Sequence, residues 1–219
     1  MLKLNPYNVV NTVGSTDLEY VKTIEHLLCS LFLHKIDNIL IEIIGQEIPI
    51  LDGSITFFNE IFDKNWIELP KKAHTLKIPS FFEIENSFFK ESEMLEIYCY
   101  IQDHKTKEKS FLYWNESSPL IAAKTYGYIQ DYYIFQNLNL GKGSNIYNTK
   151  ILSLYKNNLN KYEINYHKII DFLGDLYTTN IPYIRGTFFL CNPNHTLNNK
   201  IAKKVYDIFQ NKTMLKEER

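Results

Sequence analysis

The chain has few cysteines, no long hydrophobic run and almost no net charge, and each shortage excludes a class of protein. Only three cysteines occur among 219 residues, they lie far apart, and no two have the C-x-x-C spacing. Neither a disulfide framework nor a thiolate zinc site is therefore expected. No apolar run reaches membrane-spanning length, and the start, MLKLNPYNVV, is too short and polar for a signal-peptide core. We expect a protein of the reducing cytoplasm that is not an integral membrane protein.

The formal net charge of −1 and the lack of a basic run give no electrostatic footprint for nucleic acid, so we expect no nucleic-acid partner. Apolar side chains are plentiful instead. Hydrophobic residues make up 45% of the chain and aromatic residues 15%, which favours a folded globule over disorder. This length is enough for one large domain or two small ones.

Two segments repeat the same order of patterns, an amphipathic helix followed by a strand. Residues 23–36 have helical spacing and 38–45 alternate like a strand; residues 166–177 and 183–191 repeat that order. This repeated order indicates an α+β fold with two pseudo-repeated layers, which we place in modules of residues 1–66 and 71–219.

The remaining elements are predicted from local patterns. The first module has a strand in EIPILDGS that runs into a turn at Asp52-Gly53, and a helix near 56–64 closes it. In the second module we expect strands near 74–86 and 94–103, a hairpin turn over 103–109, a helix around 118–137 and a loop over 140–145. The C-terminal helix should begin near His195, with a frayed tail after residue 211.

The most informative stretch is YHKIIDFLGDLY, residues 166–177, because it places three polar side chains on one stripe of an apolar helix. His167, Asp171 and Asp175 are spaced at i, i+4 and i+8, which drift only about 80° around the axis. An imidazole and a carboxylate one turn apart can bind one metal ion. Gly174 lies on the same stripe, so another backbone can approach closely there. Taken alone, the stripe fits a solvated helix face better than a metal site.

Three further clusters bear on the metal hypothesis, and each has an ordinary alternative. Glu25 and His26 are adjacent on the first predicted helix, where a surface pair would also fit. His195 opens HTLNNK, which would equally serve as the start of a helix. Thr125 is a lone hydroxyl in AAKTYGY and is weak evidence alone.

Together, five blocks in this order match a known pattern: TIEHLL, EIPILDGS, KTYGY, HKIIDFLGDLY and HTLNNK. The chain resembles the zinc-dependent UDP-3-O-acyl-N-acetylglucosamine deacetylases of lipid A biosynthesis, over roughly residues 10–205. The resemblance implies an enzyme that hydrolyses the N-acetyl amide of a nucleotide sugar bearing an acyl chain. It also implies two pseudo-repeated two-layer α/β sandwich modules with the zinc site between them, and we expect a monomer.

Residue roles follow from the resemblance. His26, His167 and Asp171 would be the three ligands of a Zn²⁺ ion, with the fourth position open for water, as in catalytic sites. Such an ion lowers the pKa of bound water and polarises an amide carbonyl.

Four more residues would carry the reaction. Glu25 resembles the general base, and His195 resembles the cation that stabilises the oxyanion and protonates the leaving amine. Asp175 would orient His195 and raise its pKa. Thr125 would donate a hydrogen bond to the developing oxyanion. The family positions near the substrate correspond to Lys168, Tyr126 and Asp131.

The chain also departs from the family pattern. The family's first strands precede the segment that opens this chain, so we expect a reduced first module. Asn192-Pro193-Asn194 stand before His195, where the family usually has a basic residue first and glycine third. Two alternatives therefore stay open. One is deacetylation of another acylated amino sugar. The other is a non-catalytic, truncated paralogue that binds a ligand or partner, for which an exposed apolar patch would be the sign.

Overall fold

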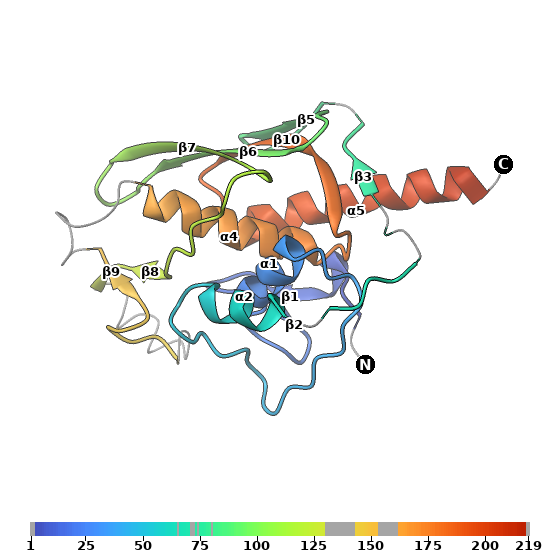
Figure 1. Ribbon diagram of the computed structural model, residues 1–219. Coiled ribbons are helices and arrows are strands. Elements are labelled where there is room, and N and C mark those ends of the chain that lie inside the picture. The colour runs from blue at the N-terminus through green and yellow to red at the C-terminus, as the bar shows by residue number, and fades with distance from the viewer. Residues whose placement is uncertain are drawn as a thin grey trace.

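A six-stranded sheet forms one layer of the structure (Figure 1). The computed structural model describes residues 3–64, 66–70, 73, 75–79, 81–129, 143–152 and 162–217, with the side chains of the last helix described as far as 211. Five strands follow one another across the sheet. In that order they are β4 (Phe82–Ile84), β5 (Ser87–Lys90), β10 (Tyr183–Cys191), β6 (Leu95–Gln102) and β7 (Lys109–Asn115).

β10 connects the two halves of this sheet. It runs parallel to β6 and antiparallel to β5, and its first residues pair in parallel with β3 (Thr75–Lys77). Alternate residues of β6 are buried, as expected for a strand with one face against helices. The hairpin turn predicted over 103–109 joins β6 to the antiparallel β7.

Two helices lie against the sheet and a third lies beyond them. α4 (Glu163–Tyr177) and α5 (His195–Glu217) cover one face of the sheet, and α1 (Glu25–Leu33) packs on α4 on the side away from the sheet (Figure 1). α2 (Thr56–Phe62), the short η1 (Pro6–Asn8) and the pair β1 (Val9–Asn11) and β2 (Asp17–Leu18) complete the N-terminal part. One apolar core runs through α1, α4 and the sheet.

Gly174 sets the distance between α1 and α4. A Cβ atom added to Gly174 would lie 2.0 Å from the carbonyl oxygen of Glu25, closer than real Cβ contacts allow. The close approach expected at this glycine is confirmed, and the partner backbone belongs to the helix that carries Glu25 and His26.

The predicted α+β class is confirmed, as are the helices at 56–62 and 163–177, the strand at 183–191 and the helix that begins at His195. That last helix continues to Glu217, through most of the segment expected to fray. The division into modules 1–66 and 71–219, and their pseudo-repeat, stay predictions.

Two predicted strands are wrong, and so is the part of a predicted helix that the structure describes up to residue 128. Residues 38–45 form no strand within the described chain, and EIPILDGS contributes only an isolated bridge between Glu47 and Lys22 before its turn. The described part of the predicted helix 118–137 is extended as far as residue 128. It contains β8 (Tyr126–Gly127), which pairs with β9 (Lys150–Ile151). Among the described helices, none combines the length and the apolar character needed to cross a bilayer.

Candidate metal centre and neighbouring acid–base residues

The crossing of α1 and α4 brings together the three predicted metal ligands. Oδ1 of Asp171 lies 3.5 Å from Nε2 of His167 and 3.7 Å from Nε2 of His26. The two imidazole rings stand edge to face, with centroids 5.1 Å apart. All three side chains are buried, so the polar stripe of α4 is not a solvated helix face.

The arrangement fits a metal ion of the zinc type. One ligand atom from each residue lies within 4.8 Å of the other two. Ligands about 2.0–2.1 Å from a tetrahedral ion are separated by about 3.4 Å from one another, close to the two Asp171 distances. Two imidazole nitrogens and one carboxylate oxygen are also a donor set that zinc accepts at catalytic sites.

The protonation states of His167 and Asp171 suit metal binding. Burial disfavours the imidazolium and lowers the pKa of His167 to about 4. Burial works against the Asp171 carboxylate, but His167 and Lys168 outweigh it and hold the pKa of Asp171 well below its usual range. A neutral imidazole and an ionised carboxylate are the forms that bind metal.

The ring of His167 is oriented by the backbone. Its Nδ1 lies 3.2 Å from the carbonyl oxygen of Ala123, which can only accept a hydrogen bond, so Nδ1 carries the hydrogen and Nε2 is left as the ligand atom that faces Asp171 and His26. The segment that holds this ligand is therefore the one that carries Thr125 and Tyr126.

Glu25 lies at the start of α1, next to His26, and is buried. Its Oε2 accepts a hydrogen bond of 2.9 Å from the backbone N–H of Thr16. Burial raises the pKa of the Glu25 carboxyl, while His195 and His26 act in the opposite direction. A carboxyl with a raised pKa close to a metal site is typical of a general base.

His195 and Asp175 form a buried pair. Nδ1 of His195 lies 2.9 Å from Oδ2 of Asp175, and Asn198 donates to the same oxygen at 2.8 Å. The hydroxyl of Thr16 donates to Oδ1 of Asp175. Burial disfavours the His195 cation, but the surrounding carboxylates, Asp175 foremost, raise the pKa of His195 to about 10.

The residues predicted to contact substrate lie around this centre, with one exception. Nζ of Lys168 is 2.9 Å from Oδ2 of Asp171 and 5.5 Å from the centre of the Tyr126 ring, and that ring lies 5.7 Å from His167. Asp131 falls outside the described residues.

Thr125 is held by backbone hydrogen bonds to two other segments. Its N–H donates to the carbonyl of Gly53 at 2.6 Å, and its carbonyl accepts from Lys150 at 2.8 Å. Gly53 has φ +82°, and a Cβ there would meet the carbonyl of Asn148 at 1.8 Å. The predicted turn at Asp52-Gly53 is confirmed, and its hydrogen bond holds the extended segment that carries Thr125.

Sequence reasoning missed Thr16 and Asn198. Both are fully buried and both donate to Asp175. The many polar residues after His195 were the only signal for Asn198, and no motif associated Thr16 with the site.

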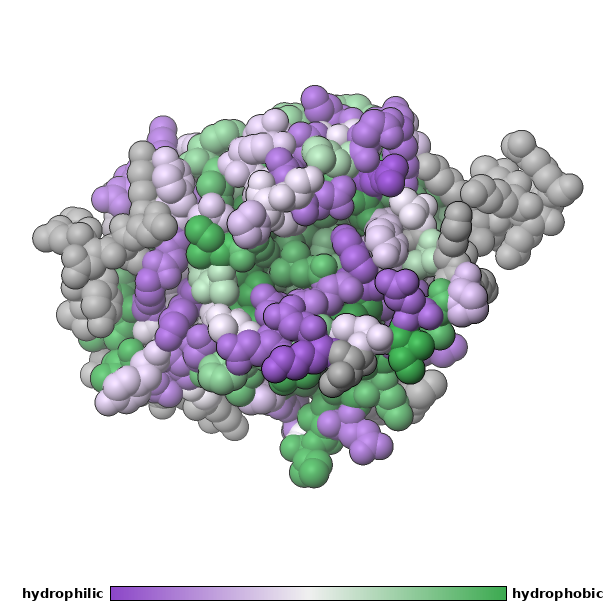
Figure 2. Space-filling model, in the orientation of Figure 1, coloured by the Kyte–Doolittle hydropathy of each residue, from purple (hydrophilic) through white to green (hydrophobic). Residues whose placement is uncertain are grey.

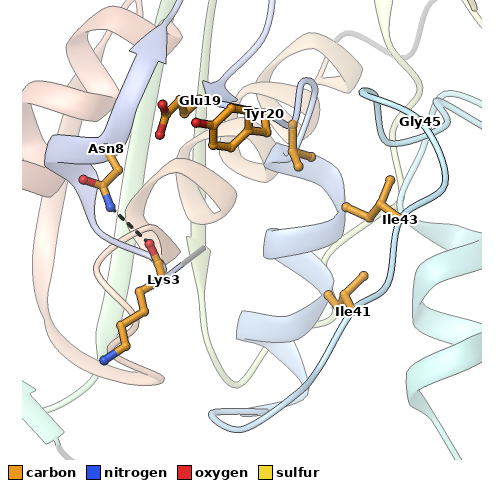
Figure 3. A pocket seen from close by; sticks show the side chains of 8 residues that line it. Lys3, Asn8, Glu19, Tyr20, Ile41, Ile43 and Gly45 are labelled. Carbon is orange, nitrogen blue, oxygen red and sulfur yellow. Dashed lines mark hydrogen bonds between the residues drawn. The ribbon is translucent and has the colours of Figure 1, made fainter. Parts of the chain in front are cut away.

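The surface has a recessed apolar area (Figure 2) and a pocket with a mixed polar and apolar lining. In Figure 2 apolar residues form a recessed area in the middle of the visible face, between hydrophilic margins. A separate pocket of about 530 Å³ lies between the N-terminal segment and residues 41–45 (Figure 3). It is lined by Lys3, Asn8, Glu19, Tyr20, Val21, Ile41, Ile43 and Gly45, none of which belongs to the metal cluster.

Comparison with known proteins agrees with the site. The family model described as UDP-3-O-acyl N-acetylglycosamine deacetylase matches residues 1–207. A protein named UDP-3-O-acyl-N-acetylglucosamine deacetylase from Aquifex aeolicus is 33% identical over 90% of this chain and 75% of its own length. A protein of the same name from Wolinella succinogenes is 28% identical over 93% of this chain and 75% of its own length. Another from Coxiella burnetii is 30% identical over 90% of this chain and 73% of its own length. The buried ligand set and these matches together show that the chain belongs to the UDP-3-O-acyl-N-acetylglucosamine deacetylase family.

Proposed function

We propose that this chain is a zinc-dependent hydrolase that removes the N-acetyl group from UDP-3-O-acyl-N-acetylglucosamine in the cytoplasm, as a step of lipid A biosynthesis. One observation carries the proposal. The buried group of His26, His167 and Asp171 lies beside a buried carboxylate, Glu25, and a buried imidazole, His195. Metal ligands, a base and an acid are the parts that amide hydrolysis needs.

His26, His167 and Asp171 would hold the ion. When bound, zinc supplies Lewis-acid chemistry, since it polarises a carbonyl and makes water more acidic. The three side chains also exclude bulk water, because each is at most 5% exposed. An electrostatic interaction is stronger in such a site than at the surface.

Glu25 would act as the general base. Its carboxylate takes one proton from the attacking water while the water oxygen bonds to the acetyl carbon. The raised pKa of Glu25 brings its basicity closer to the operating pH, where a base is most effective.

His195 would act as the general acid. Its raised pKa keeps the imidazole protonated at neutral pH, so the cation can stabilise the oxyanion of the tetrahedral intermediate. When the carbon–nitrogen bond breaks, His195 gives its proton to the amine nitrogen, and acetate and a free amino sugar leave. Asp175 holds the ring and remains ionised, as the orienting carboxylate does in other catalytic triads.

Thr125 would donate its hydroxyl hydrogen to the same oxyanion, and Lys168, Tyr126 and Asp131 would contact the sugar or nucleotide. The position of Thr125 supports this role, since the same extended segment orients the ligand His167 through the carbonyl of Ala123. The recessed apolar surface in Figure 2 suits the hydrocarbon part of an acylated substrate.

A second candidate function is binding of a partner without catalysis. Exposed apolar residues in the segment 38–45 favour it, since Leu40 is 73% exposed and Ile44 fully exposed, and the pocket in Figure 3 adjoins them. The buried acid–base set argues against it, because a protein that only binds has no physical need for Glu25 and His195 beside a metal cluster.

One experiment decides between these functions. Zinc content and acetate release from the UDP-acyl sugar are measured for the wild type, for Glu25→Gln and for the exposed control Glu83→Gln. We expect one zinc per chain in all three and turnover lower by about 10²–10⁴ in Glu25→Gln alone. Zinc without turnover would direct the search to another acylated amino sugar. If the wild type contains no zinc and shows no turnover, the binding function is supported instead.

A further inference from the structure

Thr16 contacts the proposed base, the proposed acid and the carboxylate that orients the acid. It lies in the turn before β2 and is completely buried. Its backbone N–H donates to Oε2 of Glu25 at 2.9 Å, and its hydroxyl donates to Oδ1 of Asp175. The same hydroxyl oxygen lies 3.2 Å from Nδ1 of His195.

We propose that Thr16 is a positioning residue that fixes the base, Glu25, and the acid pair, His195 and Asp175, relative to each other. This inference rests on the proposed function, because it assigns Thr16 a place in the same reaction. Thr16 itself does not touch the reacting atoms; it acts through the groups that do.

The hydrogen-bond chemistry of the hydroxyl fixes the direction of each contact. A carboxylate carries no hydrogen, so the single hydroxyl hydrogen of Thr16 must point to Asp175. The hydroxyl oxygen can then only accept from His195, which requires a hydrogen on Nδ1. Oδ2 of Asp175 requires the same hydrogen. Nδ1 therefore stays protonated, and the proton that His195 gives away leaves from Nε2.

The turn that presents Thr16 is held in place independently of the hydroxyl. The carbonyl of Thr16 accepts from the N–H of Ile24 at 3.1 Å, one residue before α1. The neighbouring Asp17 accepts from the N–H of Thr23 at 3.0 Å and from the side chains of Asn11 and Ser15 at 2.8 Å. Loss of the hydroxyl should leave the turn folded, and the N–H bond to Glu25 intact.

The size and the polarity of Thr16 can be tested separately. Thr16→Ser keeps the hydroxyl and loses a methyl group, whereas Thr16→Val keeps the volume and loses the hydroxyl. A matched control is Thr12→Val, because Thr12 lies in the same N-terminal segment and its hydroxyl contacts only Thr196 of α5 among the hydrogen bonds described, at 2.8 Å.

We expect Thr16→Val to lower kcat by about tenfold or more and to change KM by less than about twofold, since a hydrogen bond to a charged group is lost away from the substrate. Thr16→Ser and Thr12→Val should stay close to the wild type. Equal impairment of Thr16→Ser and Thr16→Val, or impairment of Thr16→Ser alone, would show that packing matters instead and would overturn the proposal.

A second readout does not depend on turnover. The Nδ1 proton of His195 is observed by NMR and assigned by its loss in His195→Gln. In Thr16→Val its exchange with water should be at least about tenfold faster than in the wild type. Unchanged exchange would overturn the proposal, even if the wild type proved to deacetylate nothing. Should Thr16→Val fail to fold, Thr16→Ala removes the same hydroxyl without a new methyl group beside Asp175, and the same two criteria apply.

Discussion

The ammonium group of Lys168 lies 2.9 Å from Oδ2 of Asp171, while Oδ1 of the same carboxylate faces both imidazoles. The two oxygens of Asp171 thus have different partners. Lys168 neutralises the oxygen that points away from the cluster, and Asp171 in turn raises the pKa of Lys168 against the effect of burial. Lys168 therefore has a second role available to it, beside the predicted contact with substrate.

Replacement of Lys168 by alanine should weaken zinc binding by about 10–100-fold, because the outer oxygen of a buried ligand loses its partner. Competition with a chromophoric chelator measures this affinity. Lys200→Ala is the control, since Lys200 pairs with Glu85 at the surface. An unchanged zinc affinity with a raised KM would instead assign Lys168 to the substrate alone.

Gly174→Ala should destabilise the fold by about 1–3 kcal/mol or more, because the new Cβ would overlap the carbonyl oxygen of Glu25. For a chain of this size, each kcal/mol of lost stability lowers Tm by about 2–4 °C. Calorimetry measures it, with Gly127→Ala as control, since a Cβ at Gly127 meets nothing within 4 Å. Equal melting of the two variants would mean that α1 can move away from α4 at little cost.

Asp175→Asn should move the basic limb of the pH–kcat profile to lower pH. The pKa of His195 in the fold is about 10, against an ordinary value of 6.5. The amide that replaces the carboxylate is neutral, so the His195 cation would lose its proton at lower pH. Asp63→Asn is the control, because Asp63 forms a similar pair with His34 at the surface. If the basic limb does not move, it reports the titration of a group other than His195.

The same pair should make stability depend on pH. Because the folded pKa of His195 is raised, the stabilisation is complete below about pH 6.5 and is lost as the pH rises through about 10. Denaturant unfolding at pH 6 and at pH 9.5 should show a larger decrease for the wild type than for Asp175→Asn. Parallel curves for the two proteins would show that the ion pair does not contribute.

Thr125→Val should lower kcat by about 10²–10³ without loss of zinc, as expected when one donor to an oxyanion is removed. Thr125→Ser should retain most activity. Thr75→Val, at an exposed position of β3, controls for the substitution itself. If Thr125→Val turns over normally, another group stabilises the oxyanion.

Local patterns predicted the elements whose formation needs little from distant residues. The helix 163–177 carries its own amphipathic stripe, so its polar face and its C-terminal end were predicted from residues 166–177, although it begins three residues earlier. Residues 38–45 have an equally clear alternation but form no strand in the described chain, because a strand requires a partner at hydrogen-bonding distance. In 118–128 helical composition did not decide the structure, because Thr125 donates a backbone hydrogen bond to Gly53 and accepts one from Lys150.

In the candidate site, too, local spacing was predicted from the sequence, whereas contacts between distant residues were not. The spacing of His167 and Asp171 on one helix is local and was predicted, and family resemblance supplied Glu25, His26 and His195. Thr16 and Asp175 are 159 residues apart and meet only in the folded chain. A threonine before a short strand has no periodicity or motif that would distinguish it, so its contacts with the acid–base residues required the structure.

The glycine contact between α1 and α4 also bears on how the ion enters. Since the two main chains touch at Gly174, backbone packing, and not the ion, sets the spacing of His26 from His167 and Asp171. The three ligands are then already arranged before the ion binds, and binding requires little rearrangement of the two helices. Uptake should be a single second-order process without a slow unimolecular phase, and the amide exchange rates of both helices should hardly differ between stripped and reconstituted protein.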